Sequence, residues 1–392
     1  MRSLRTMPAR RLAALLAAAV GVVGGGTAIA VAGGDGPTPP PKPLAVAIHD
    51  AATAPPVDGI TANIRFTNHL IDASSFQGSD PLLTGATGRL WLGAGHRLRL
   101  ELQSDSGDVQ IVSDGTTVSV YDASMNTVYR ADLPQDKTAP TADAPPTLAS
   151  IQDDLAKLAE HWNISGAQPA SVAGHPAYTV RISPKHDGGL LGAAELAADA
   201  NTGVPLRAAV YAVGNSSPVL ELEATRLSYG KVDGSVFDIT PPADAKVTDL
   251  TRKTAAPAAG GTEPKPVTGA SAVAAAVPFT LSAPDTLAGL QRAEVRLVHA
   301  GDHPAALVTY GTGLGGIAVL EQTADPGSGG APAKPKEGES GLSLPTVSIN
   351  GATAQELETP LGTMVRFMRA GVAYTVVGSV PAATAEAAAR GL

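Results

Sequence analysis

The most regular hydrophobic pattern of the chain lies between Gly88 and Leu133, where apolar and polar residues alternate. Leu98, Leu100 and Leu102 are separated by charged residues, so a strand through this segment has one apolar and one polar face. The alternation returns in the segments that follow, with only short polar turns between them. The pattern therefore predicts consecutive antiparallel strands, a β-meander with one apolar face.

The dipeptide Asp114-Gly115 predicts the tightest turn of this meander. It lies between two runs of β-forming residues, and such a pair favours a two-residue hairpin loop because both positions accept a positive φ. The resulting register places four apolar side chains on one face: Val109 opposite Val120, and Ile111 opposite Val118.

Further elements are predicted on both sides of the meander. Alternating segments predict strands at residues 60–70, 177–183, 193–199, 204–213 and 219–229, and residues 44–52 predict a short helix. A longer amphipathic helix is predicted after Thr147, a residue type that caps helix N-termini well. Its apolar residues recur at helical spacing: Leu148, Ile151, Leu155, Leu158 and Trp162. Residues 44–250 are thus expected to form one domain, in which about residues 60–247 make one antiparallel sheet with a long helix available to cover its apolar face.

A second, smaller β-rich domain is predicted at residues 269–392, beyond an Ala-, Pro- and Gly-rich linker at residues 251–268. Its strands are expected at residues 294–298, 305–310, 316–322 and 364–377, with a flexible insertion at 324–345 and a closing helix at 382–389. If Ala370-Gly371 forms the last turn, Phe367 faces Tyr374 and Val365 faces Val376.

Residues 1–32 carry the pattern of an export signal, because several arginines precede an uncharged apolar run. The run from Leu12 to Ala32 could span a bilayer core of about 30 Å as a helix, whereas Ala28-Ile29-Ala30 favours cleavage. The segment is therefore either a signal peptide or a membrane anchor. Both readings make the chain exported and extracytoplasmic, secreted or anchored to the cytoplasmic membrane, with residues 33–43 as a Pro-rich linker.

Composition and charge exclude several classes of function. The formal net charge is -8, with no dense basic patch beyond the N-terminus, which argues against a nucleic-acid partner. The chain has no cysteine, which excludes disulfides, thiolate metal sites, cysteine nucleophiles and acylation on a lipobox cysteine. Glu221 and Glu223 alternate outward on a predicted strand and have no expected partner, so they indicate a solvated face.

Two further motifs contain residue types found in metal or dinucleotide sites, but the sequence around them does not fit such a site. His299 and His303 flank a turn, and no third metal ligand follows from the spacing. Gly311, Gly313 and Gly316 match a dinucleotide-binding spacing, but a strand is expected after them, so no helix N-terminus is available for a pyrophosphate. No catalytic residue, metal or cofactor is predicted.

The remaining feature is the apolar face of the sheet together with the apolar stripe of the helix. They either pack on each other as a closed core, or enclose a hydrophobic cavity with the helix as its plug or lid. In the second case the cavity is lined by Leu98, Leu100, Leu102, Val109, Ile111, Val118 and Val120 from the meander, and by Leu148, Ile151, Leu155, Leu158 and Trp162 from the helix. An acyl chain needs no polar specificity group, so missing motifs do not count against lipid binding.

Three segments carry a family resemblance: residues 90–92 (LWL), 111–115 (IVSDG) and 236–242 (VFDITPP). In order and spacing they resemble landmarks of the LolA superfamily of lipoprotein carriers, and residues 199–207 resemble that family's strand-turn-strand before its last hairpin. The resemblance covers residues 44–250. It implies a mainly β (α+β) fold, a curved antiparallel half-barrel with a covering helix and an apolar cavity for acyl chains.

The second domain makes the whole chain similar to the two-domain RseB-like (MucB/RseB) regulators, which bind an anti-sigma factor and sense lipoproteins or lipids. Residues 93–95 (GAG) lie where the carrier has a basic residue that helps to shut its lid. Since no catalytic residue is predicted, the expected function is non-enzymatic. The chain is expected to bind a lipid or lipoprotein acyl chain, as an RseB-like sensor or a lipid-presenting protein. The expected partners are that acyl chain, an anti-sigma factor or other envelope protein, and the membrane if residues 1–32 are uncleaved. The alternatives are a filled-core envelope scaffold that acts only by protein–protein binding, and a LolA-type lipoprotein carrier.

Overall fold

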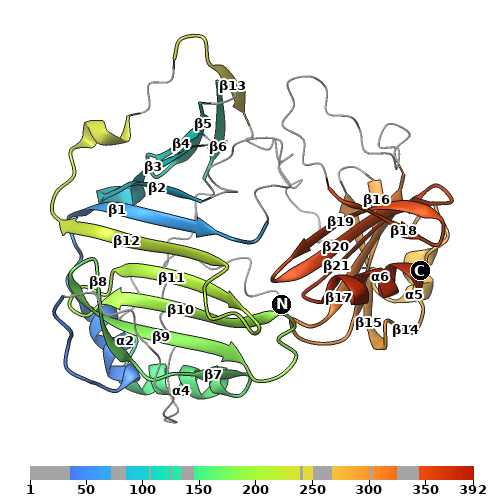
Figure 1. Ribbon diagram of the computed structural model, residues 1–392, viewed down its shortest axis with the longest axis horizontal. Coiled ribbons are helices and arrows are strands. Elements are labelled where there is room, and N and C mark those ends of the chain that lie inside the picture. Colours follow the sequence, from blue (N-terminus) through green and yellow to red (C-terminus); the bar gives the residue numbers. More distant parts are fainter. Residues whose placement is uncertain are drawn as a thin grey trace, which may run out of the picture.

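The computed structural model is mainly β and consists of two sheets (Figure 1). It describes residues 36–71, 85–105, 107–123, 126–133, 145–238, 242–249, 267–300, 303–324 and 344–392. The expected signal peptide or anchor, most of the expected linker at 251–268 and most of the expected insertion at 324–345 lie outside the described residues. Among the described residues, no helix has the length and apolarity needed to cross a membrane.

The first sheet holds thirteen strands. They are β1 (Gly59–Asn68), β2 (Ala86–Gly93), β3 (Arg97–Ser104), β4 (Gly107–Ser113), β5 (Thr117–Asp122), β6 (Thr127–Asp132), β7 (Trp162–Ile164), β8 (Gln168–Val172), β9 (His175–Pro184), β10 (Leu191–Asp199), β11 (Pro205–Ala212), β12 (Leu220–Tyr229) and β13 (Lys246–Asp249). Their order across the sheet is β13-β6-β5-β4-β3-β2-β1-β12-β11-β10-β9-β7, and β8 also pairs with β9. All pairs are antiparallel except β13 with β6.

The β-meander expected from the sequence is confirmed as strands β2 to β6, but the register of its central hairpin differs from the expected one. Ile111 pairs with Val120 instead of Val118. The Asp114 carboxylate accepts hydrogen bonds from the backbone nitrogens of Thr116, at 2.7 Å, and Thr117, at 2.8 Å. This side-chain turn lengthens the loop. Because the partner moves by two positions, every side chain keeps its expected face.

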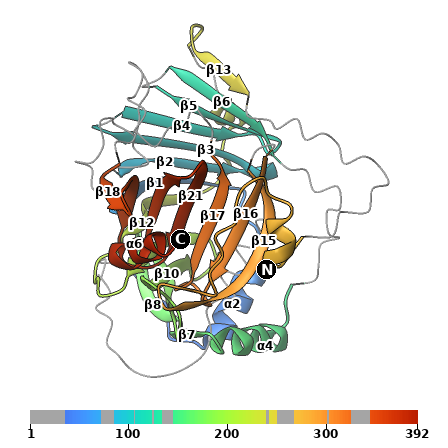
Figure 2. The same ribbon diagram turned by 90° about the vertical axis from the view of Figure 1, so that its right-hand side faces the viewer.

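The first sheet curls strongly (Figures 1 and 2). His175 on β9 and Tyr229 on β12 pack edge to face, with ring centroids 5.4 Å apart. Two strands lie between β9 and β12, so a flat sheet would separate them by about 14 Å. The expected curved half-barrel is confirmed.

Two helices pack together at one end of this sheet. They are α2 (Leu44–Thr53) and α4 (Leu148–Ala159), and Thr147 caps α4 by accepting a hydrogen bond from the backbone nitrogen of Ser150. The helix ends before Trp162, which instead opens β7 by pairing with Pro184. Strands β7 and β8 were not predicted from the sequence.

The chain after β12 crosses the polar face of the meander and then joins its free edge. A short 3-10 helix, η3 (Gly234–Phe237), lies against β3, where Arg99 donates a hydrogen bond to the Val236 carbonyl at 2.8 Å. The chain then returns as β13 beside β6.

The second sheet holds eight strands in the order β14-β15-β16-β17-β21-β20-β19-β18. They are β14 (Thr286–Leu287), β15 (Leu290–Ala300), β16 (His303–Tyr310), β17 (Ile317–Thr323), β18 (Thr346–Ile349), β19 (Ala352–Thr359), β20 (Gly362–Arg369) and β21 (Val372–Gly378). Helices α5 (Ala270–Ala274) and α6 (Ala382–Arg390) cover one of its faces (Figure 1). The closing helix and the strands at residues 294–322 are thus confirmed, whereas β14, β18, β19 and α5 were not predicted.

The last hairpin has the register expected from the sequence. Phe367 pairs with Tyr374, and Val365 with Val376. The turn residues Ala370 and Gly371 have φ values of 50° and 78°, as a two-residue hairpin loop of this type requires. Phe367 and Tyr374 stack with their ring centroids 4.9 Å apart in the core of the second sheet.

Candidate functional site

The apolar face of the meander is only partly covered. The register confirms that the seven candidate residues of β3 to β5 share one face. Leu102 and Val109 are buried, at 2% and 6% exposure. The other five are half-buried: Leu98, Leu100, Ile111, Val118 and Val120.

This apolar face continues across β2 and β1 to β12. Leu102 pairs with Gly88, and the neighbouring pair Phe66 with Ala86 lies on the same face. Phe66 in turn pairs with Leu222 of β12, whose side chain is 43% exposed. We call this surface, from Val120 to Leu222, the apolar strip. Exposed side chains at its far end show that the described residues do not close it.

The helix stripe lies elsewhere on the sheet. Ile151 and Leu155 are buried against α2 and against Tyr178 of β9, and Leu158 and Trp162 pack into the same cluster. Leu148 is 38% exposed. The expected covering helix is therefore present, but together with α2 it covers β7 and β9. The structure does not bring its apolar stripe together with the meander residues.

The motifs that carry the family resemblance meet on the opposite face of the meander. Trp91, Val112, Val236 and Phe237 form one small cluster with Val232. A Cβ at Gly93 would lie 2.7 Å from the Phe237 ring, so glycine is required there for the ring to pack. The three motifs thus hold the returning chain against the sheet, a structural role that their order along the sequence does not reveal.

The polar face of β9 to β12 carries a network of ion pairs. Glu195 accepts hydrogen bonds from Arg181 at 2.6 Å, Arg207 at 2.8 Å and Tyr211 at 2.9 Å. Burial alone would raise the pKa of Glu195, but the hydrogen bonds from Arg207, Arg181 and Tyr211 outweigh it and lower the pKa. The arginines neutralise the carboxylate, so the network stabilises the sheet and offers no general base.

Glu221 and Glu223 differ from the expectation of a partnerless, solvated face. Glu221 pairs with Arg207 at 2.6 Å, and Glu223 lies 3.7 Å from Arg65. The pairs join neighbouring strands, which the sequence spacing could not show.

A second polar cluster, also missed at the sequence level, lies where the sheet curls most. The Asp199 carboxylate accepts a hydrogen bond from the Tyr229 hydroxyl at 2.8 Å and lies 3.2 Å from Nδ1 of His175. Burial and the Asp199 hydrogen bond raise the pKa of Tyr229, against a lowering contribution from Thr202, so its hydroxyl stays protonated. The backbone nitrogens of Asn201 and Thr202 also donate to Asp199. With its carboxylate thus occupied, the cluster fastens β9 to β12 and holds no activated nucleophile.

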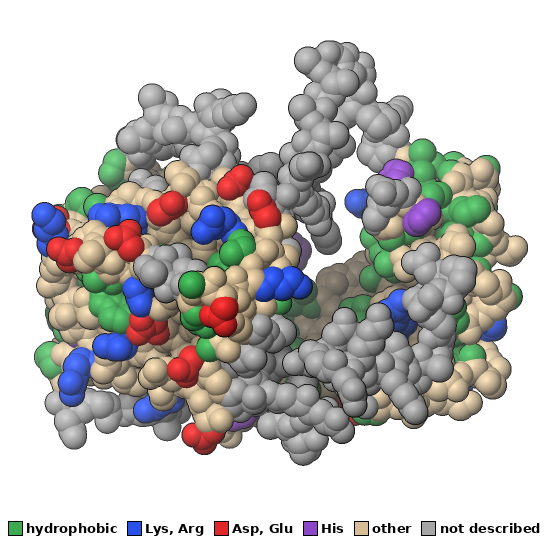
Figure 3. Space-filling model, turned by 90° about the horizontal axis from the view of Figure 1, so that it is seen from above, with side chains coloured by type: hydrophobic (Ala, Val, Ile, Leu, Met, Phe, Trp, Pro, Cys, Tyr) green, Lys and Arg blue, Asp and Glu red, His purple; other side chains and the backbone are tan. Residues whose placement is uncertain are grey.

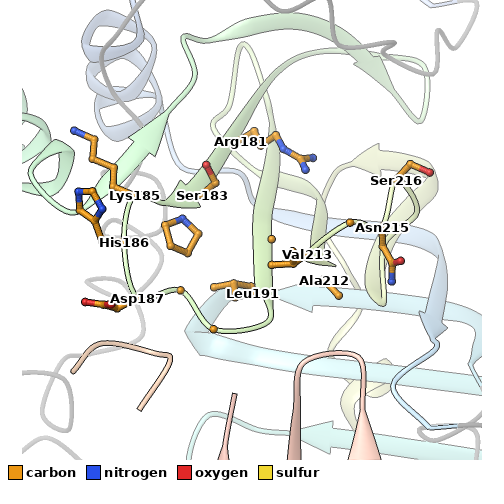
Figure 4. A pocket seen from close by; sticks show the side chains of 15 residues that line it. Arg181, Ser183, Lys185, His186, Asp187, Leu191, Ala212, Val213, Asn215 and Ser216 are labelled. Atoms are coloured by element: carbon orange, nitrogen blue, oxygen red, sulfur yellow. The ribbon is translucent and has the colours of Figure 1, made fainter. Parts of the chain in front are cut away.

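An open hollow of about 640 Å³ lies where β9 ends and β10 begins (Figure 4). Leu191 and Val213 lie in the middle of it, and Val213 is 59% exposed. Arg181, Asn215 and Ser216 lie on one side, and Lys185, His186 and Asp187 lie on the other. None of the residues of the apolar strip lines this hollow.

No group of three or more His, Cys, Asp or Glu side chains that could hold a metal occurs in the part of the chain that the structure describes. The Gly311–Gly316 segment forms a loop followed by strand β17, as expected.

Several solved structures are similar to the chain. MucB in complex with MucA(peri) is 16% identical, over 88% of this chain and 94% of that chain, with a TM-score of 0.39. The MucA/MucB complex of Pseudomonas aeruginosa is 17% identical, over 88% and 96%, with a TM-score of 0.41. A LolA superfamily protein from Nitrosomonas europaea is 11% identical, over 50% of this chain and 96% of that chain, with a TM-score of 0.22.

The sequence matches no protein-family model and no curated protein. The names that these structures carry, MucB and LolA superfamily, are those of the families named in the sequence analysis.

Proposed function

We propose that the chain is a non-enzymatic, extracytoplasmic protein that binds the acyl chain of a lipid or lipoprotein on the apolar strip. The observation that carries the proposal is the incomplete cover of this surface. Five meander residues remain half-buried and Leu222 is 43% exposed, while α2 and α4 pack over β7 and β9. A hydrocarbon chain would complete the packing that the described elements leave unfinished.

Burial of hydrocarbon alone supplies enough free energy for such binding. Each methylene removed from water contributes about 0.8 kcal/mol, so a long acyl chain gains on the order of 10 kcal/mol before the cost of association. An acyl chain needs no charged partner, and most members of the strip are Leu, Val, Ile, Phe and Ala. Gly88 and Ser113 lie on the same face, and Asp122 lies at its margin opposite Val109.

The proposal assigns separate roles to the two ends of the chain. Residues 44–250 form the acyl-binding domain, and residues 269–392 form a second domain that reports the bound state to a protein partner. The resemblance to RseB-like regulators supports an anti-sigma factor or another envelope protein as that partner, and MucB itself has been crystallised with MucA. Residues 1–32 direct export, as signal peptide or anchor.

The experiment measures acyl binding to delipidated protein with a fluorescent long-chain fatty acid, and native mass spectrometry of protein from its own host identifies the ligand. Ile111→Ser and Val120→Ser each remove apolar surface from the middle of the strip. Each is expected to weaken binding by about ten- to sixtyfold, because losing two to three methylene equivalents costs roughly 1.5–2.5 kcal/mol.

Val213→Ser is the matched control, because Val213 is exposed outside the strip and should leave the affinity unchanged. Circular dichroism confirms that each variant is folded. Equal affinity in all three variants would exclude the strip as the binding surface, and a delipidated parent that takes up no acyl ligand would favour the scaffold alternative.

A further inference from the structure

The two sheets touch through the loop between β9 and β10, residues 185–190. The backbone nitrogen of Gly315 donates a hydrogen bond to the Asp187 carbonyl at 2.7 Å, and the Thr312 hydroxyl donates to the Asp187 carboxylate at 3.1 Å. On the other side of the loop, the Leu190 nitrogen donates to the carbonyl and the hydroxyl of Ser379, at 3.1 Å and 3.0 Å. One loop of the first sheet thus contacts two separate loops of the second.

Glycines on both sides allow the backbones to approach closely. Gly189 has a φ of 57°, and a Cβ there would lie 2.2 Å from the Ser379 carbonyl oxygen. Gly313 has a φ of 64°, and a Cβ there would lie 2.7 Å from the Asp187 Cβ. Any other residue at either position would be strained and would push the sheets apart.

The contact is specific but weak. None of the apolar clusters among the described residues contains side chains from both sheets. Lys185, His186 and Asp187 are exposed, so water competes for the hydrogen bonds of the loop. Interfaces that are small and polar permit relative movement of the parts that they join.

The surroundings leave room for such movement. Seen from above, a deep gap separates the bodies of the two sheets (Figure 3). The same loop also lines the hollow beside Leu191, with its residues 185–189 facing that hollow on one side and the second sheet on the other.

We infer that residues 185–190 form a latch, a breakable contact that holds the second sheet against the first and whose release lets the two sheets separate. The inference does not depend on lipid binding, since it rests on the polar contact, the paired glycines and the absence of a shared apolar cluster among the described residues. In the closed state Gly189 and Gly313 let the two sheets approach and the hydrogen bonds of the loop form. In the open state these hydrogen bonds are broken and the sheets are apart.

The absence of cysteine in the sequence allows a direct distance measurement. Asp153→Cys on α4 and Ala387→Cys on α6 introduce exposed sites for two spin labels in the full chain, one for each sheet. Double electron–electron resonance then measures the distance distribution between the labels. Gly189→Ala in this background introduces the clash with Ser379 and is expected to lengthen and broaden the distribution.

Gly214→Ala is the matched control. Gly214 lines the same hollow and has a φ of 79°, but a Cβ there would meet nothing within 4 Å. Backbone strain is therefore similar in both variants, and only Gly189→Ala presses on the second sheet.

Gly313→Ala tests the latch from the other sheet and is expected to reproduce the shift seen with Gly189→Ala. Retained far-ultraviolet circular dichroism shows that the sheets themselves are intact. The latch is refuted if the distributions of Gly189→Ala and Gly313→Ala superimpose on that of the parent, or if Gly214→Ala broadens the distribution equally.

Discussion

Glu321 lies in the core of the second sheet, and its side chain is fully buried, at 0% exposure. Its Oε2 accepts a hydrogen bond from the Ser282 nitrogen at 2.9 Å, whereas Oε1 has no hydrogen-bond partner among the described residues. Burial raises the pKa of Glu321 to about 7, against the opposing effects of the Ser282 hydrogen bond and of Arg369. The carboxyl group is therefore protonated in the folded protein at mildly acidic pH.

The raised pKa makes the stability of the second sheet depend on pH. Its ordinary value is 4.5, so the unfolded chain ionises at a lower pH than the folded one. The stabilising contribution is complete below pH 4.5 and is lost as the pH rises to about 7. A shift of this size corresponds to about 3 kcal/mol, since each pKa unit equals about 1.4 kcal/mol.

Glu321→Gln replaces the carboxyl group by a neutral group of the same shape. Urea unfolding between pH 4.5 and 8.5, with a probe in the second sheet, should show equal stability of variant and parent at the acidic end. The variant should then become progressively more stable than the parent, by up to about 3 kcal/mol above pH 7.

Glu294→Gln is the control, because Glu294 lies on the same sheet but is exposed beside Arg296. It should not reproduce the pH-dependent gain. A stability difference between Glu321→Gln and the parent that stays constant from pH 4.5 to 8.5 would refute a raised pKa at Glu321.

Three further changes test the packing. Leu155→Ala should destabilise the first sheet by about 2–5 kcal/mol in urea unfolding, because Leu155 is 0% exposed. Leu148→Ala, at a 38% exposed site on the same helix, should cost under about 1 kcal/mol. Equal losses of stability in the two variants would contradict the packing of α4. Glu195→Ala should cost about 3 kcal/mol at neutral pH, because it leaves Arg181 without its carboxylate and Arg207 with only Glu221. The loss should shrink as the pH falls through the lowered pKa of Glu195, and a pH-independent loss would argue against the ion pairs. Ala370→Asn should stabilise the last hairpin by about 0.5–1 kcal/mol in thermal unfolding, because Ala370 has a positive φ that Asn accepts more readily; a lower melting temperature would disprove this.

The two hairpins show where sequence reasoning succeeds and where it fails. Ala370-Gly371 offers no side chain that competes for the turn, and the register found is the register predicted. Asp114 has a carboxylate that binds the following backbone nitrogens, so the loop became longer than the dipeptide pattern indicates. The dipeptide pattern indicates which backbone conformations the two residues favour, but it does not show that the Asp114 carboxylate also binds the backbone nitrogens that follow it.

The candidate site was predictable in its parts and not in its assembly. Periodicity identified the apolar face of β3 to β5 and the apolar stripe of α4, because strand alternation and helical spacing are both local patterns of the sequence. The pairing of α4 with α2 depends on contacts between residues about a hundred positions apart along the chain, and no local pattern specifies them. For the same reason the partners of Glu221 and Asp199 became visible only in the structure.

Strand β13 has a consequence for how the molecule meets its neighbours. By running beside β6, it occupies backbone donors and acceptors that would otherwise be open to a strand from another chain. The opposite margin consists of two short strands, β7 and β8, which pair with successive parts of β9 and offer little length for such recruitment. In the part of the chain that the structure describes, the first sheet thus leaves the apolar strip uncovered without offering a long free strand edge along which copies of the chain could polymerise.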